Sequence, residues 1–165
     1  MTLLWLFINL ITAVLASFVI GIFENTIQKV IALAVLMPIV ASMGGNAATQ
    51  TLTVTIQLIA SQQLNVKNVM KIINREVVTG LLNGLVFAAI TGVFVYFWFH
   101  DLKIAILIGA AMIVNLTVAG LAGIAIPVTL NKMKIDPAVS ATVFVTTVTD
   151  VVGFFAFLGI ASLFV

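Results

Sequence analysis

The chain contains five apolar runs, each long enough to cross a lipid bilayer, separated by short polar stretches. Their approximate ranges are 3–23, 30–60, 77–99, 104–130 and 137–164. A transmembrane α-helix needs about 20 predominantly apolar residues, whereas the strands of a membrane barrel show alternating patterns of about 10 residues. Of all residues 63% are hydrophobic and 7% are charged, and soluble domains carry roughly 25% charged residues. The sequence therefore predicts an all-α, polytopic membrane protein with five transmembrane helices.

This composition excludes several kinds of site. The chain has no cysteine, which rules out disulfides and thiolate metal ligands, so a metal ion would have to bind oxygen. Seven Lys and Arg residues and a formal net charge of +2 are too few for a nucleic-acid-binding surface. The single histidine, His100, lies in a short connection between two spans, and we interpret it as a solvated loop residue. No repeat interrupts the pattern, and we expect residues 1–165 to form a single membrane domain.

The connections between the spans carry most of the charge. Lys67, Lys71 and Arg75 recur at intervals of four within residues 61–76, which we interpret as an interfacial helix on an anionic leaflet, with a solvated loop as the alternative. The third span ends in the aromatic sequence YFWF, which is typical of a membrane surface. Before the fifth span, Asp136-Pro137 predicts an acidic N-cap followed by proline at the first helical position.

The distribution of basic residues predicts the orientation of the chain. The second and fourth connections contain Lys67, Lys71, Arg75, Lys132 and Lys134, whereas the first and third contain only Lys29 and Lys103. Cytoplasmic loops of membrane proteins carry an excess of Lys and Arg. We therefore expect the N-terminus to be cytoplasmic and the C-terminus external.

Two of the spans carry a polar stripe at helical spacing. The stripe in the second span consists of Ser42, Gly45, Asn46, Thr49, Gln50 and Thr53, and that in the fifth of Thr142, Thr146, Thr149, Asp150 and Gly153. Such faces either pack together, with about 0.6 kcal/mol per interhelical hydrogen bond, or line a hydrated path. In the fourth span, by contrast, the isolated Asn115 predicts an interhelical hydrogen bond.

The carboxyl group of Asp150 favours the hydrated path. A charge at the bilayer centre costs about 2.5–3.5 kcal/mol on the insertion scale, and no Lys or Arg lies at matching depth in the sequence. The group must then be protonated, hydrated or compensated by a transient cation. Mg²⁺ dehydrates reluctantly and is often held through its waters by one or two carboxylates. We also expect Pro38 and Gly44-Gly45 to kink the second span and free backbone carbonyls for the ion.

Several motifs resemble those of the MgtE family of magnesium channels and its eukaryotic relatives. They are WLFINLITA with GIFE in the first span, P-x₅-GGN-x₃-Q in the second, DPA before the fifth, and TT-x-TD-x-x-G within it. They occur in order and cover the whole chain. Two departures concern Ala48-Thr49, where the family often has Gly-Asn or Gly-Thr, and Thr142, where some members have Asn.

The resemblance implies a magnesium channel or transporter of the plasma membrane rather than an enzyme. It implies a homodimer whose second and fifth helices line a central pore, with Asp150 recognising a largely hydrated Mg²⁺. The expected pore-lining residues are Gly45, Asn46, Thr49, Thr53, Thr142 and Thr146, and we add Thr149 from its place on the stripe. Family members also carry cytosolic N-terminal and CBS domains that sense Mg²⁺, and the sequence resembles the pore domain alone.

Three other functions remain as alternatives. The chain could be a carrier for another divalent cation, or a membrane assembly module that conducts nothing. An intramembrane aspartyl protease would need two carboxylates sharing one site, whereas the spans offer only Asp150 at depth. An assembly module has no use for a hydrated carboxylate, so the hydration of this carboxyl group distinguishes a cation pathway from an assembly module.

Overall fold

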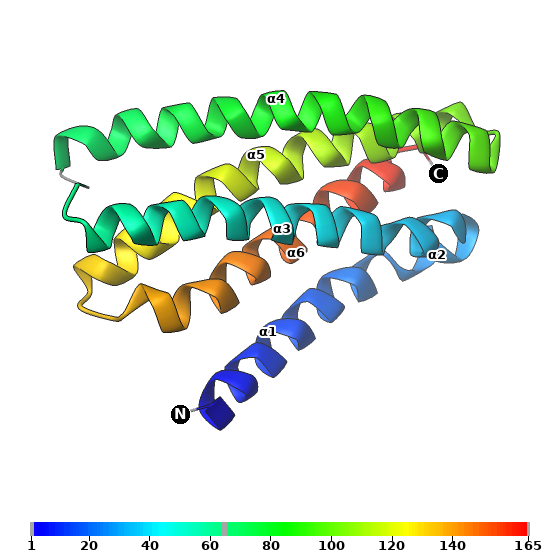
Figure 1. Ribbon diagram of the computed structural model, residues 1–165. Coiled ribbons are helices and arrows are strands. Elements are labelled where there is room, and N and C mark those ends of the chain that lie inside the picture. The colour runs from blue at the N-terminus through cyan, green and yellow to red at the C-terminus, as the bar shows by residue number, and fades with distance from the viewer. Residues whose placement is uncertain (1, 64–65, 165) are drawn as a thin grey trace.

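The structure, a computed structural model, describes residues 2–63 and 66–164; the side chains of Thr2, Val66 and Lys67 are not described. In this part of the chain all regular structure is helical, without a β-strand. The helices are α1 (Thr2–Ile22), α2 (Glu24–Lys29), α3 (Ala32–Ala60), α4 (Val66–Phe99), α5 (Leu102–Lys132) and α6 (Pro137–Ser162). Figure 1 shows that the long helices run roughly antiparallel to their sequence neighbours, with the two ends of the chain toward opposite ends of the bundle.

Five of the described helices, all except the short α2, are long and apolar enough to span a membrane. This confirms the prediction of an all-α membrane protein with five spans. The polar segment after the first span forms the six-residue α2, which connects α1 to α3. The predicted N-cap of the fifth span is confirmed, because Asp136 accepts a hydrogen bond from the Ala138 backbone N–H at 2.9 Å. Asp101 caps α5 in the same way, accepting from the Lys103 backbone N–H at 2.7 Å.

Helix α5 is the central element of the bundle, because it packs on α3, α4 and α6. Its contact with α4 is close enough to bring the two backbones together at glycines. A Cβ at Gly80 would lie 2.5 Å from the Leu116 carbonyl oxygen, and one at Gly84 would lie 2.8 Å from the Ile113 Cα. Helices α3 and α4, by contrast, barely contact each other. The position of α4 relative to α3 is therefore set through α5.

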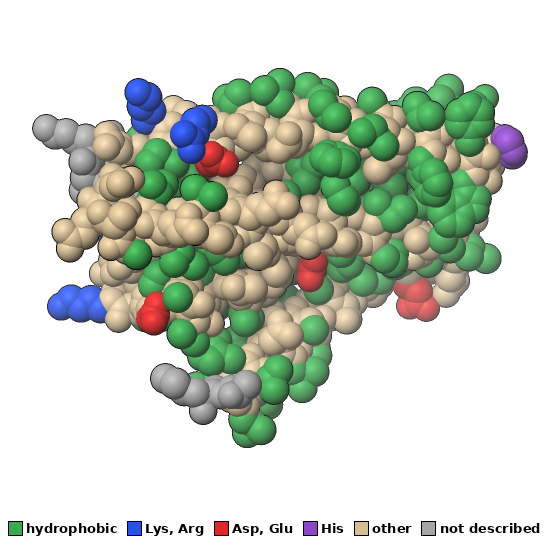
Figure 2. Space-filling view, viewed as in Figure 1, with side chains coloured by type: hydrophobic (Ala, Val, Ile, Leu, Met, Phe, Trp, Pro, Cys, Tyr) green, Lys and Arg blue, Asp and Glu red, His purple; other side chains and the backbone are tan. Residues whose placement is uncertain are grey.

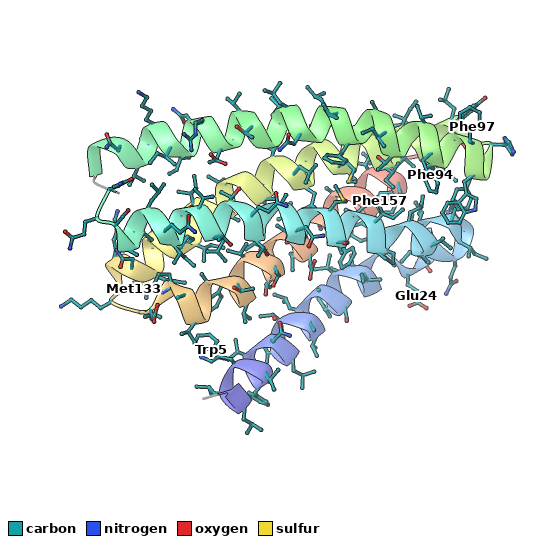
Figure 3. All side chains as sticks on the ribbon, viewed as in Figure 1. Trp5, Glu24, Phe94, Phe97, Met133 and Phe157 are labelled. Atoms are coloured by element: carbon teal, nitrogen blue, oxygen red, sulfur yellow. The ribbon has the colours of Figure 1, made fainter. Side chains whose placement is uncertain are left out.

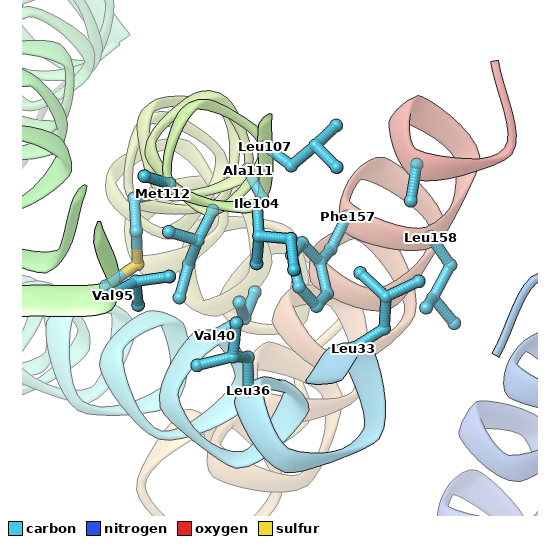
Figure 4. Close-up of a cluster of buried hydrophobic side chains, with 13 residues drawn as sticks. Leu33, Leu36, Val40, Val95, Ile104, Leu107, Ala111, Met112, Phe157 and Leu158 are labelled. Atoms are coloured by element: carbon cyan, nitrogen blue, oxygen red, sulfur yellow. The ribbon is translucent and has the colours of Figure 1, made fainter. Parts of the chain in front are cut away.

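A cluster of buried apolar side chains holds three of the long helices together. Figure 4 shows Leu36 and Val40 from α3 facing Met112 from α5, with Phe157 from α6 beside them. All four side chains have no exposed surface. Because close packing and small residues drive association of helices in lipid, this cluster fixes α3 and α6 against the same side of α5.

Helix α1 diverges from the rest of the bundle. It packs mainly on α6, and its buried positions, Ala16 and Val19, are in its second half. Trp5 lies on the part that points away from the other helices (Figure 3). The remainder of α1 exposes large apolar side chains, as expected of a helix that faces lipid or another protein chain.

The segment 61–76 differs from the sequence-based prediction. Residues from Val66 onward belong to α4, which continues without interruption to Phe99, so there is no separate interfacial helix in the described part. At 34 residues α4 is about 51 Å long, against a hydrocarbon core of about 30 Å. The helix therefore extends past the membrane core at its basic end, where Figure 2 shows Lys and Arg side chains gathered. Lys71 and Arg75 belong to this extension, as does Lys67, whose side chain is outside the described set.

Candidate functional site

The two polar stripes come together because α3 packs directly against α6. One point of contact is at a glycine: a Cβ at Gly45 would lie 4.0 Å from the Thr146 Cγ2 atom. A Cβ there would make only an ordinary van der Waals contact, so the two faces touch lightly at this level. The structure thus places side by side two helix faces that are about 100 residues apart in the sequence.

Most of the predicted lining residues are accessible on this α3–α6 face. On α3, Asn46 and Thr53 are exposed and Gly45 and Thr49 are partly buried. On α6, Thr142 is exposed, and Thr146 and Asp150 are partly buried. These residues form a polar surface that is open to water or to a partner chain in the single protomer.

Thr149 is the exception among the predicted lining residues. It has no exposed surface, and its hydroxyl group donates to the Thr146 carbonyl oxygen at 2.9 Å. Gly153, one turn further along α6, is also buried. Both residues lie toward the α3 and α5 side of α6, so Thr149 does not contribute to the exposed polar surface of the protomer.

The threonine hydroxyls of this surface have a common geometry. Thr49 donates to the Gly45 carbonyl oxygen, Thr53 to that of Thr49, and Thr146 to that of Thr142, with distances of 2.8, 2.8 and 2.9 Å. Each hydroxyl proton is therefore used within its own helix, and the lone pairs of the oxygen remain free to accept. A row of such oxygens is suited to water molecules that donate hydrogen bonds, as the waters around a cation do.

The Asp150 carboxylate has no partner within the described residues. No hydrogen bond or ion pair involves it there, and the Arg75 side chain pairs with Glu76 instead. The described residues also contain no group of three or more His, Asp or Glu side chains that could enclose a metal ion. An ion beside Asp150 would therefore keep most of its water ligands.

Asn115 connects α5 to the backbone of α3, which confirms the predicted interhelical hydrogen bond. Its side-chain Nδ2 donates to the Val40 carbonyl oxygen at 2.8 Å, and the residue has no exposed surface. Two glycines make room for this amide: a Cβ at Gly44 would overlap it, and one at Gly153 would lie 2.7 Å from Nδ2. The Asn115 Oδ1 atom has no hydrogen-bond partner among the described residues. The amide therefore lies where α3, α5 and α6 meet, within one turn of Asp150.

The expected release of backbone carbonyls at the α3 glycines is not observed. The helix is continuous through Pro38 and through Gly44-Gly45, and the Gly45 carbonyl oxygen accepts the hydrogen bond from Thr49. These glycines do not free carbonyl ligands for an ion. Instead Gly44 makes room for the Asn115 amide, whereas a Cβ at Gly45 would fit in ordinary contact with Thr146. The requirement for glycine at position 44 therefore comes from packing between helices and not from an ion site.

Taken with the five spans, these features define a multi-pass α-helical membrane protein with a polar intramembrane face that carries a carboxylate. The chain belongs to the MgtE family, because the family model described as a divalent cation transporter matches residues 37–160.

Three curated relatives match almost the entire chain. It is 29% identical to the magnesium transporter MgtE of Bacillus subtilis over 161 residues, which cover 98% of this chain and 36% of the relative. It is 34% identical to the magnesium transporter MgtE of Enterococcus faecalis over 160 residues, 97% of this chain and 35% of the relative. With the protein of that name from Thermus thermophilus it shares 30% identity over 159 residues, 96% of this chain and 35% of the relative. The chain thus spans about a third of the length of these relatives.

Proposed function

We propose that this chain conducts Mg²⁺ across the plasma membrane along the polar face of α3 and α6, with Asp150 as the residue that recognises the ion. The observation that carries the proposal is the Asp150 carboxylate, which has no protein partner in the described part and lies beside a row of hydroxyl oxygens. An intramembrane carboxylate without a basic partner is costly unless water or a cation compensates it. The names of the relatives, all magnesium transporters, favour Mg²⁺ as that cation.

The ion passes with most of its water ligands attached. Mg²⁺ binds water tightly, and the carboxylate attracts it through the intervening waters. The oxygens of Thr49, Thr53, Thr142 and Thr146, together with the Asn46 amide oxygen, accept hydrogen bonds from these waters. The charge of Asp150 attracts the hydrated ion, and the neutral oxygens contact its water ligands without binding the ion strongly.

The conducting unit in this proposal is a homodimer within the lipid bilayer. A single protomer contributes one carboxylate, and its α3–α6 face is open on one side. A two-fold axis along this face closes the path and places two Asp150 carboxylates around one divalent ion. Residues 1–165 act as one membrane domain in this arrangement. In the family this domain operates with cytosolic regulatory domains.

The test is Mg²⁺ uptake into liposomes by the purified protein and its Asp150→Asn variant. Asparagine keeps the size of the side chain but removes the charge, so we expect the variant to fold and assemble normally and to lose most Mg²⁺ uptake. Asp101→Asn is the matched control, because asparagine also caps a helix N-terminus and Asp101 lies in a connection. We expect this control to keep normal uptake. Normal, Mg²⁺-selective uptake by Asp150→Asn would show that the carboxylate is not the recognition site.

A further inference from the structure

A second polar opening lies on another side of α3, between α3, α4 and α5. It is a cavity of about 190 Å³, and its polar lining comes from Gln50 and Thr51 on α3 and from Glu76, Thr79 and Asn83 on α4. The sequence pattern placed Gln50 on the polar stripe of the second span, but in the structure it lines this cavity. The lining contains no residue of α6, so the cavity is separate from the path along Asp150.

The walls of this cavity are positioned by the backbone. On the α5 side, a Cβ at Gly120 would lie 2.6 Å from the Glu76 carbonyl oxygen, and a Cβ at Gly80 would lie equally close to α5. Helices α4 and α5 are thus in direct backbone contact beside the cavity. Because α3 and α4 barely touch, the space between them is left open by the fold itself.

The lining is chemically uniform, since every polar side chain in it carries an oxygen acceptor. The Glu76 side chain is 20% exposed, and its Oε1 atom accepts from Arg75 Nη2 at 3.0 Å. The Arg75 side chain is 65% exposed and reaches the carboxylate from the solvent side. The amides of Gln50 and Asn83 form no hydrogen bond within the described residues. Gln50, Thr79 and Asn83 are exposed and Glu76 is partly buried, so their oxygen atoms are open to water or to a hydrated ligand.

We propose that this cavity binds a hydrated divalent cation, with Glu76 as its charged ligand. One carboxylate with amide and hydroxyl oxygens is a donor set for a hard cation that keeps part of its water shell. The carboxylate repels an anionic lipid headgroup, and the polar lining disfavours an acyl chain. Arg75 competes with the cation for the same carboxylate, so the guanidinium group must move away when the ion binds. The site adds a second cation position beyond the proposed path and does not require that path to conduct.

The experiment uses Mn²⁺, a paramagnetic substitute for Mg²⁺, counted by electron paramagnetic resonance in a non-ionic detergent without phosphate. We expect Glu76→Gln to remove one bound, Mg²⁺-displaceable Mn²⁺ per chain, and Asp150→Asn and Asp101→Asn to leave that ion in place. Arg75→Gln removes the competing charge. It should tighten binding at this site by up to about fivefold, the equivalent of about 1 kcal/mol for an exposed ion pair.

Two results would overturn the proposal. The first is an unchanged Mn²⁺ count in a Glu76→Gln protein that elutes and folds like the wild type. The second is an unchanged or weaker Mn²⁺ affinity in Arg75→Gln, which keeps the carboxylate and tests the site even if Glu76→Gln misfolds. Failure of the transport proposal has a different signature, since Asp150→Asn would then transport normally while Glu76→Gln still lost its ion.

Discussion

The contact between Gly44 and the Asn115 amide allows a quantitative test of how α3 is held against α5. A Cβ at Gly44 would overlap the amide, and the same amide donates to the Val40 carbonyl oxygen. In Gly44→Ala, overpacking destabilises the protein by about 1–3 kcal/mol, and loss of the interhelical hydrogen bond destabilises it by about 0.6 kcal/mol. The higher helix propensity of alanine stabilises it by about 1 kcal/mol. We expect a net loss of about 0.5–2.5 kcal/mol in the free energy of unfolding.

Gly21→Ala is the matched control for this substitution. Gly21 is also helical, but nothing lies within 4 Å of a Cβ placed there. Alanine should therefore be neutral or stabilise by up to about 1 kcal/mol. The free energies come from equilibrium unfolding with sodium dodecyl sulfate, followed by circular dichroism. The two variants should differ by about 0.5–3.5 kcal/mol.

The double variant Gly44→Ala/Asn115→Ala separates this contact from general damage to α3. Truncating Asn115 vacates the space that the new methyl group needs, so the double variant should be more stable than the sum of the single effects by at least about 1 kcal/mol. Additive effects would refute the reasoning. Equal stability of Gly44→Ala and Gly21→Ala would refute it as well, because the Asn115 amide would then not constrain Gly44.

The remaining predictions concern topology and assembly, and the absence of native cysteine makes both accessible to single-cysteine variants. With the N-terminus cytoplasmic, a cysteine at His100 should react with an impermeant reagent from outside and one at Lys71 should not; the reverse pattern would invert the orientation. A cysteine at Thr146 should crosslink two chains if α6 faces a two-fold axis, whereas Gly153, packed on Asn115, is unsuitable as a crosslinking site. A strictly monomeric protein that still conducts Mg²⁺ in lipid would contradict the dimer.

The polar stripes of α3 and α6 show how much of the site could be predicted from the sequence. The spacing of the stripes correctly grouped Asn46 with Thr53 and Thr142 with Thr146 on accessible faces. It also grouped Thr149 and Gly153 with them, and these two are buried. An ideal helical period assigns residues to a face about 100° wide, but whether the margin of that face is open depends on how the neighbouring helix packs. For α6 the margin is covered by α3 and α5.

The sequence by itself determined the class of protein and the order of its elements. Apolar runs of the right length admit only membrane helices, because backbone groups in lipid must be satisfied within their own segment. Asp136-Pro137 marked the start of α6 by local chemistry. The cost of the Asp150 carboxyl group in an apolar medium predicted a functional position, and this role stays a prediction. Each of these inferences depends on residues that are close together in the chain.

Only the tertiary structure decided which surfaces meet. The hydrogen bond from Asn115 to Val40 joins residues 75 positions apart, and it gives Gly44 a packing role that helix propensity could not reveal. The continuous α4 and the cavity beside Glu76 likewise follow from backbone contact between α4 and α5 at Gly80 and Gly120. Such contacts depend on the rotation and offset of whole helices, which are set by the combined packing of all their neighbours and not by any local pattern.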